Sequence, residues 1–254
     1  MTDPVNTLFE CWLGELHTNL QQLVFAANNH NPNDHKDDSS LRNLIDQSVG
    51  RYRQYYNMKS AVAKKDVFSL FPPSWLTSLE DAFSWMGGWQ PSTAIHLLYS
   101  KSSVQVEACF ADLTSVITSD DLGDLSLSQI NLVDALQKKT VCEERKISEK
   151  MAKVQESAAD TSMVDLSNVI SEMIRDENEE GVNASDGRVE LTLEPKMDAL
   201  EEVMRLADGL RMETLKAVIE ILTPIQGVYF LIAAAELRLR LHEWGLKKDT
   251  EKNS

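Results

Sequence analysis

The stretch Trp85-Met86-Gly87-Gly88-Trp89-Gln90-Pro91-Ser92 connects two segments with helical sequence patterns, and it decides how they are joined. Its Gly-Gly pair permits backbone dihedral angles closed to other residues and lets another segment approach closely. Pro91 fits only the first turn of a following helix, where Ser92 can help to form the cap. The stretch therefore predicts a corner between two helices. It lacks the lysine and the preceding strand that a phosphate-binding loop requires.

The composition is that of a helical globular protein. Of the 254 residues, 43% are hydrophobic and 26% charged, and only 10 are Gly and 7 Pro. Scarce helix breakers favour helices. The formal charge of −15 argues against direct nucleic-acid binding, because that affinity comes largely from Lys and Arg facing phosphates. The longest apolar stretch, 228–235, is far shorter than the ~20 residues that span a bilayer, so no membrane insertion is expected.

The cysteines and the first residues indicate a reducing compartment. Cys11, Cys109 and Cys142 are too few and too scattered for a disulfide framework or a zinc site. No basic segment followed by an apolar run opens the chain, so no secretory signal is expected. We therefore expect the protein in the nucleus or cytoplasm.

Apolar residues recur at spacings of three and four, which predicts helices. The predicted helical segments are 7–28, 39–65, 75–86, 91–117 with a break near 102–103, 128–158, 161–174, one starting at Pro195 and one starting at Pro224. Thr223 and Pro224 form a cap and first-turn pair, and Gly245 is predicted as the C-cap of the last helix.

Residues 176–187 are rich in Asp and Glu and are predicted to form an acidic mobile loop. The alternation of Val189, Leu191 and Leu193 with polar residues predicts an extended piece after it. The fold class is thus all-α, a bundle of seven to nine helices. We expect a single domain over 1–245 with a charged tail at 246–254; a subdivision near 176–194 is the alternative.

The motifs of common enzymes and metal sites do not occur: the sequence has no Cys-x-x-Cys, His-Glu-x-x-His or Gly-x-Ser-x-Gly. We therefore predict that the protein is not an enzyme. His242 has two interpretations, a histidine favoured at a helix C-terminus by the macrodipole or an axial ligand of haem. Trp75 and Trp85 are expected in the core. Trp12 is expected to be exposed as a partner-binding residue, because Trp is enriched at binding hot spots.

Four groups of motifs, in this order, resemble the Delay of Germination domain family of plants. The motifs are Asp66-Val67-Phe68 with Pro73-Ser74-Trp75, Glu80 with the stretch 85–92, Ala207-Asp208-Gly209-Leu210-Arg211 with Thr214-Leu215, and Leu222-Thr223-Pro224-Ile225-Gln226-Gly227 with Leu241-His242-Glu243-Trp244-Gly245. The resemblance covers nearly the whole chain. It assigns structural roles to Trp75, Trp85, Gly87, Gly88, Pro91, Pro224 and Gly227.

The same domain forms the C-terminal half of TGA-type bZIP transcription factors. This chain begins directly with the domain, so it is expected to lack their basic DNA-reading region and to be of the stand-alone type. The resemblance implies a regulator of seed dormancy and abscisic acid responses that binds type 2C protein phosphatases and associates with itself. The alternative is a transcription-regulatory module that dimerises with bZIP-type factors.

The resemblance also implies two sets of site residues. The phosphatase-contacting segment corresponds to 7–12, where Phe9 and Trp12 keep the aromatic pair and Cys11 replaces an acidic residue. The family's haem site uses two histidines one turn apart on the last helix. His242 matches the second, and Arg238 stands at the first. We expect no cofactor, with haem at His242 as the alternative.

Overall fold

The computed structural model describes residues 4–31, 35–71, 76–102, 122, 125–175 and 179–252. Its elements are α1 (Pro4–Asn28), α2 (His35–Ala63), η1 (Phe68–Leu70), α3 (Ser78–Ala82), α4 (Ser92–Lys101), α6 (Leu127–Glu156), η2 (Ser157–Ala159), α7 (Thr161–Arg175), α8 (Glu179–Ile221) and α9 (Pro224–Lys252). All elements of this described part are helical, which confirms the predicted all-α class, and the number of α-helices lies within the predicted range.

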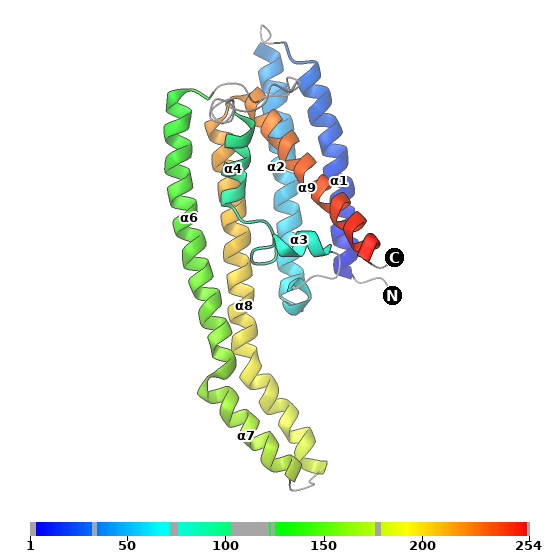
Figure 1. Cartoon of the computed structure of the whole chain (residues 1–254), viewed down its shortest axis with the longest axis vertical. Coiled ribbons are helices and arrows are strands. Elements are labelled where there is room, and N and C mark those ends of the chain that lie inside the picture. Colours follow the sequence, from blue (N-terminus) through cyan, green and yellow to red (C-terminus); the bar gives the residue numbers. More distant parts are fainter. Residues whose placement is uncertain are drawn as a thin grey trace.

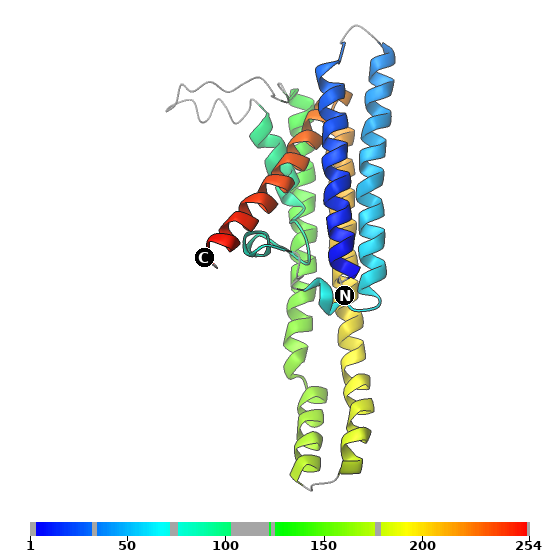
Figure 2. The same cartoon turned by 90° about the vertical axis from the view of Figure 1, so that its right-hand side faces the viewer.

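The long helices run roughly along one axis and form the bundle (Figure 1). The paired helices α6 and α8 lie side by side, as do α1 and α2, and α9 crosses α1 and α2 obliquely (Figure 2). The short helix α4 packs against α6, α8 and α9. The core between them includes the fully buried side chains of Leu23, Ile95, Leu98, Val133, Val218 and Val228. Hydrophobic side chains from six helices thus build one main core.

Caps fix where several helices begin. The Ser126 side chain accepts a hydrogen bond from the Gln129 backbone N–H, and the Gln129 side chain accepts one from the Ser126 backbone N–H. These two bonds form a capping box at the start of α6. Gln129 also donates to the Ile221 carbonyl oxygen (2.9 Å) and to Gln226 Oε1 (2.8 Å). The first turn of α6 is therefore tied to the α8–α9 turn.

Two helices extend beyond the core as an arm, which we define as α7 together with residues 179–194 of α8. Both views show them projecting past the end of the bundle (Figures 1 and 2). Between Ser148 and Glu202, no residue whose burial is described is buried. The arm therefore has no core of its own.

The predicted acidic loop is wrong from residue 179 onward, because α8 begins at Glu179 and runs through Gly187. Carboxylates near a helix N-terminus interact favourably with its macrodipole, so an acidic run there can start a helix. Residues 176–178 lie outside the described residues. The predicted extended piece at 189–193 is also helical, since α7 provides a packing partner that favours helix over an unpaired strand.

Two predicted helix ends are wrong as well. Pro195 lies inside α8 rather than at its start; the residues at 191 and 195 are exposed, so water can replace the hydrogen bond that proline cannot make. Gly245 is not a C-cap, because α9 continues to Lys252 and includes most of the predicted tail. The third helix is shorter than the predicted 75–86, because α3 covers Ser78–Ala82.

Several predictions fall on residues that the structure does not describe. These are the core position of Trp75, the helical segment at 103–117 and Cys109. They stay predictions.

Candidate functional site

The corner at 85–88 is a tight two-residue turn between α3 and α4. The Trp85 N–H donates to the Gly88 carbonyl oxygen (2.7 Å), and the Gly88 N–H donates to that of Trp85 (3.1 Å). Met86 (φ 46°) and Gly87 (φ 66°) both have positive φ, as in a type I′ turn. Positive φ is unfavourable for methionine, so the surrounding contacts must hold this conformation.

Arg211 of α8 supplies those contacts. Its side chain is fully buried, and its guanidinium donates to the carbonyl oxygens of Trp85, Met86 (3.0 Å) and Trp89 (2.7 Å). The guanidinium also lies 5.5 Å from the centroid of the Trp85 ring. A planar fork with five donors in fixed directions can satisfy several carbonyls and a carboxylate at once. Arg211 therefore organises the whole corner.

Asp208 and Lys59 complete this buried cluster. Asp208 Oδ1 accepts hydrogen bonds from Arg211 Nη1 and from Lys59 Nζ (2.9 Å), and Lys59 Nζ also donates to the Gly87 carbonyl oxygen (2.8 Å). Burial lowers the pKa of Lys59 to about 8, although the Asp208 carboxylate opposes this shift. We call Lys59, Asp208, Arg211 and the turn 85–89 the corner cluster; it joins α2, α8 and the corner.

The two glycines of the corner are required by space. A Cβ atom on Gly87 would lie 2.8 Å from Met204 Sδ, and one on Gly88 would lie 2.9 Å from Arg211 Cζ. Both tryptophans are partly buried and bonded: Trp85 Nε1 donates to Ser148 Oγ (3.2 Å), and Trp89 Nε1 donates to the Tyr56 hydroxyl (2.7 Å). These contacts place Gly87, Gly88 and the two tryptophans in the packing of the corner.

Pro91 and Ser92 start α4 as predicted, but the capping group comes from another helix. Pro91 is the N-cap residue and is buried. The Ser92 backbone N–H donates to Glu144 Oε1 of α6 (2.6 Å), and Gln90 Nε2 donates to Oε2 (3.0 Å). A carboxylate at a helix N-terminus satisfies a free N–H and complements the dipole.

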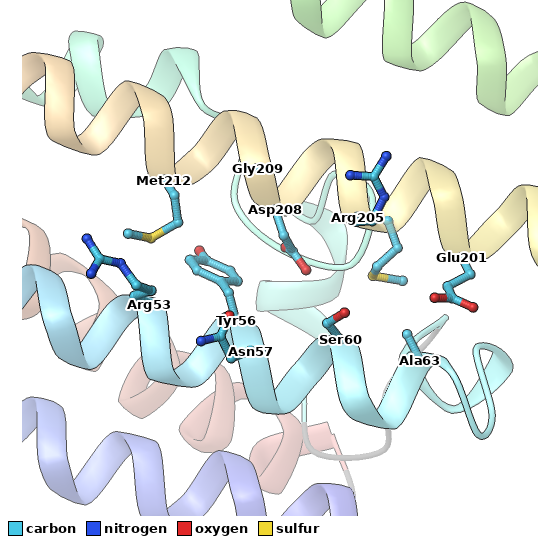
Figure 3. A pocket seen from close by; sticks show the side chains of 11 residues that line it. Arg53, Tyr56, Asn57, Ser60, Ala63, Glu201, Arg205, Asp208, Gly209 and Met212 are labelled. Carbon is cyan, nitrogen blue, oxygen red and sulfur yellow. The ribbon is translucent and has the colours of Figure 1, made fainter.

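A shallow groove of about 190 Å³ lies between α2 and α8, over the corner cluster (Figure 3). It is lined by Arg53, Tyr56, Asn57, Ser60, Ala63, Glu201, Met204, Arg205, Asp208, Gly209 and Met212. Asp208 and Tyr56 belong to both the groove and the hydrogen-bond network beneath it. The groove and the network thus share two residues.

A second buried polar cluster lies where α1, α3 and α9 meet, and we call it the α1–α3–α9 junction. Thr77 and Glu80 form a capping box at the start of α3. Arg238 Nη1 lies 2.8 Å from Glu80 Oε1, and His242 Nδ1 lies 3.0 Å from Oε2. One carboxylate whose side chain is 1% exposed thus binds two side chains of α9.

Electrostatics favour the ionised form of Glu80. Burial opposes ionisation, but Arg238, the Thr77 backbone N–H and His242 outweigh it and hold the pKa of Glu80 below its usual range. Since an ionised carboxylate only accepts hydrogen bonds, His242 Nδ1 carries the proton of the shared bond.

Gly245 brings α3 and α9 together at the same junction. A Cβ atom there would lie 2.0 Å from Thr77 Oγ1 and 2.5 Å from Thr77 Cβ. Four residues further along α9, Asp249 Oδ2 accepts a hydrogen bond from the Ser78 backbone N–H (2.9 Å). The glycine is therefore needed for the close approach of α3.

The junction brings together the predicted partner-binding pair and the predicted haem ligand. Phe9 lies 5.8 Å, ring centroid to ring centroid, from His242, and Arg238 lies over the rings of Phe9 (5.2 Å) and Trp12 (5.9 Å). Trp12 also packs against Tyr52 and Tyr55. The expectation that this aromatic pair is exposed is wrong: Phe9 is 3% and Trp12 8% exposed, because α9 and α2 cover that face of α1.

The residues at the junction do not fit a haem held by two histidines. Arg238 stands where the first histidine would be, and its guanidinium forms an ion pair with Glu80 instead of offering a lone pair to iron. His242 is bonded to the same carboxylate and packs edge-on against Phe9. Within the described residues, no group of three or more His, Cys, Asp or Glu could hold a metal ion.

Pro224 and Gly227, the other predicted structural residues, shape the start of α9. Pro224 is its first residue, and the Thr223 backbone N–H donates to Gln226 Oε1 (3.0 Å). A Cβ atom on Gly227 would lie 3.1 Å from Ile45 Cδ1. The glycine thus allows α9 to pack closely on α2.

We expect Glu80→Gln to weaken the acid dependence of stability. The pKa of Glu80 is lowered by folding, so its ionisation stabilises the fold above about pH 4.5, and that contribution is lost as pH falls through the folded-state value. Losing the charged hydrogen bonds should cost about 1.5–3 kcal/mol at neutral pH.

Urea unfolding followed by circular dichroism between pH 3 and 7 measures this effect. The variant should approach the wild-type stability as pH falls. A constant difference across the whole range would contradict the assignment of the charge to Glu80.

Sequence reasoning missed the charged residues that matter most: Lys59, Glu80 in its junction role, Asp208, Arg211 and Arg238. Two signals were present. Thr77-Ser78-Leu79-Glu80 has the spacing of a capping box. Asp208 and Arg211 are charged residues one turn apart, and each directly follows an apolar position, Ala207 and Leu210. Their partners across the bundle had no local signal.

Comparison with known proteins now identifies the family. Residues 19–100 match the DOG1 family model, described as seed dormancy control. The chain is 31% identical to Protein DOG1-like 4 of Arabidopsis thaliana over 243 residues, which are 94% of this chain and 91% of that protein. The chain belongs to the DOG1-like family. This DOG1-like chain is also 28% identical to Protein DOG1-like 3 of the same plant, over 95% of the chain and 83% of that protein.

Transcription factors form a second group of relatives. The chain is 26% identical to Arabidopsis thaliana Transcription factor TGA6, over 91% of the chain but 60% of that protein. The family resemblance inferred from the sequence motifs is therefore confirmed, together with its link to TGA factors. As far as the helices of this DOG1-like chain are described, none is both long and apolar enough to cross a membrane.

Proposed function

We propose that this DOG1-like chain is a non-catalytic regulator of seed dormancy and germination that works by binding other proteins in the nucleus and cytoplasm. Its similarity to DOG1-like proteins over 94–95% of its length carries this proposal. The use of its buried charges supports it. Lys59, Asp208 and Arg211 bind one another and backbone carbonyls, and Glu80 binds Arg238 and His242. Such clusters hold helices in place and leave the outer surface for recognition.

The first candidate partner is a type 2C protein phosphatase of abscisic acid signalling. The segment that the family resemblance assigns to this contact, 7–12, is the start of α1. Since Phe9 and Trp12 face the core, a partner would meet the outward residues Thr7, Glu10 and Cys11, which are exposed. We infer that the aromatic pair positions this surface and that the outward residues make the contact.

We expect Glu10→Arg to weaken phosphatase binding at least tenfold without changing the unfolding midpoint, because reversing a rim charge alters association but leaves the core intact. Glu15→Arg is the matched control: it makes the same charge change on another exposed face of α1. Trp12→Ala should instead lose about 3–5 kcal/mol of folding stability, as expected for a buried tryptophan. Binding to purified phosphatase by calorimetry, with unfolding curves for each variant, measures both effects.

The outcomes of this experiment test the contact surface and the partner class separately. Equal binding by Glu10→Arg, Glu15→Arg and wild type would reject the outward surface of 7–12. No binding of any phosphatase by the wild-type chain would reject this partner class.

The alternative partner is a bZIP-type transcription factor, and the similarity to TGA6 over 91% of the chain favours it. The same calorimetry with a TGA-type factor in place of the phosphatase separates the two. Tight binding to the factor alone would favour a transcription-regulatory module.

A further inference from the structure

Two chain segments pass from the bundle into the arm at the same level. The first runs from the end of α6 through η2 and Asp160 into α7. The second is α8 itself at Pro195. Proline has no backbone N–H, so the helical hydrogen bond to residue 191 is missing there. The first crossing therefore leaves regular α-helix, and the second lacks one helical hydrogen bond at the same level.

Lys196 joins the two crossings. Its Nζ donates to the Ser157 carbonyl oxygen (2.9 Å) and to Asp160 Oδ2 (2.5 Å). The side chain of Lys196 is 16% exposed and that of Asp160 is 41% exposed, so the ammonium end of this ion pair is the more protected.

The position of Lys196 suits the ends of two helices. Ser157 is the C-cap of α6, where a cation is favourable, and Asp160 lies before the first residue of α7, where an anion is favourable. Asp160 Oδ1 accepts hydrogen bonds from Ser162 Oγ (2.6 Å) and from the Met163 backbone N–H (3.0 Å). Hydrogen bonds from Lys196, Ser162 and Met163 hold the pKa of Asp160 far below its usual range.

We propose that the arm moves relative to the bundle about a joint formed by residues 157–160 and Pro195, and that Lys196 is the latch that closes this joint. The main contacts of α7 are with α8 and with η2 at the joint. The arm has no buried residue among those whose burial is described, and it projects freely beyond the bundle (Figure 2). Among the described residues, the joint therefore links the arm to the bundle.

Hydrogen exchange of the full chain, measured by mass spectrometry, tests the latch. Lys196→Met removes the charge and keeps the aliphatic stem. We expect exchange in peptides covering 157–175 and 188–199 to rise about tenfold, because helices with little tertiary packing fray when their base is released. Peptides covering 203–221 should not change. Lys153→Met, an exposed lysine in the last turn of α6, is the matched control.

Two further variants separate the latch from general stability. Asp160→Asn keeps a side-chain cap for α7 but loses the ion pair, so it should raise exchange in the same peptides. Pro195→Ala restores a backbone donor and should lower it. The proposal is overturned if Lys196→Met leaves the arm peptides unchanged, or if it raises exchange equally in 203–221. It is also overturned if Pro195→Ala has no effect on the arm.

Discussion

Replacing Arg211 with methionine is expected to cost about 3–5 kcal/mol of folding stability, since breaking a buried charge network by removing one partner is strongly destabilising. The substitution leaves the carbonyl oxygens of Trp85, Met86 and Trp89 without their donor. It also leaves Asp208 bound to Lys59 alone among the described residues of the corner cluster. For a chain of this size, the melting temperature should fall by roughly 10 °C.

Lysine cannot rescue this position, because an ammonium group lacks the planar fork that reaches several carbonyls together. Arg205→Met is the control, since Arg205 lies on the same helix with its side chain 59% exposed and pairs with Glu202 at the surface. That change should cost less than about 1 kcal/mol. Urea unfolding monitored by tryptophan fluorescence compares the two variants. Similar losses for both would show that the corner does not depend on Arg211.

Gly245→Ala is expected to separate α3 from α9. The new methyl group would lie 2.0 Å from Thr77 Oγ1, and both atoms sit on short side chains that cannot swing away. Overpacking of this kind costs typically about 1–3 kcal/mol and sometimes more. Moving α3 would also lengthen the contacts of Glu80 with Arg238 and His242. The junction as a whole should therefore loosen.

Gly209→Ala provides the opposite control. Gly209 is an exposed helical glycine of α8 with no atom within 4 Å of an added Cβ, so alanine there should stabilise by about 0.5–1 kcal/mol. Unfolding curves and hydrogen exchange of peptides covering 76–84 measure both variants. A gain in stability for Gly245→Ala like that for Gly209→Ala would refute the close approach of α3.

The main helices were predictable because their signals are local. Apolar spacing of three and four marks α1, α2 and α6, and the Thr223–Pro224 pair marks the start of α9. The corner was predictable in kind because Gly-Gly followed by Pro specifies a turn before a helix. The acidic run at 179–187 was mistaken for a loop, since composition alone does not distinguish a solvated helix start from a mobile segment.

The candidate sites depend on contacts that no local pattern encodes. Lys59 and Asp208 are 149 residues apart, and Glu80 and His242 are 162 residues apart. Phe9 and Trp12 were expected at the surface. Their burial could not be predicted, because the chain segment that contacts them, around Arg238 and His242, lies at the opposite end of the sequence. Their sequence positions could be recognised, but not the direction in which they face.

The corner cluster has a consequence for synthesis on the ribosome. The carbonyl oxygen of Trp89 accepts a hydrogen bond from Arg211, which is synthesised 122 residues later. At about 5–20 residues per second, that interval lasts roughly 6–24 s. During this time the Arg211 guanidinium that binds the carbonyl oxygens of Trp85, Met86 and Trp89 is absent, so the emerging first half cannot adopt its final packing. Premature termination before residue 211 should yield a fragment that chaperones retain or proteases remove.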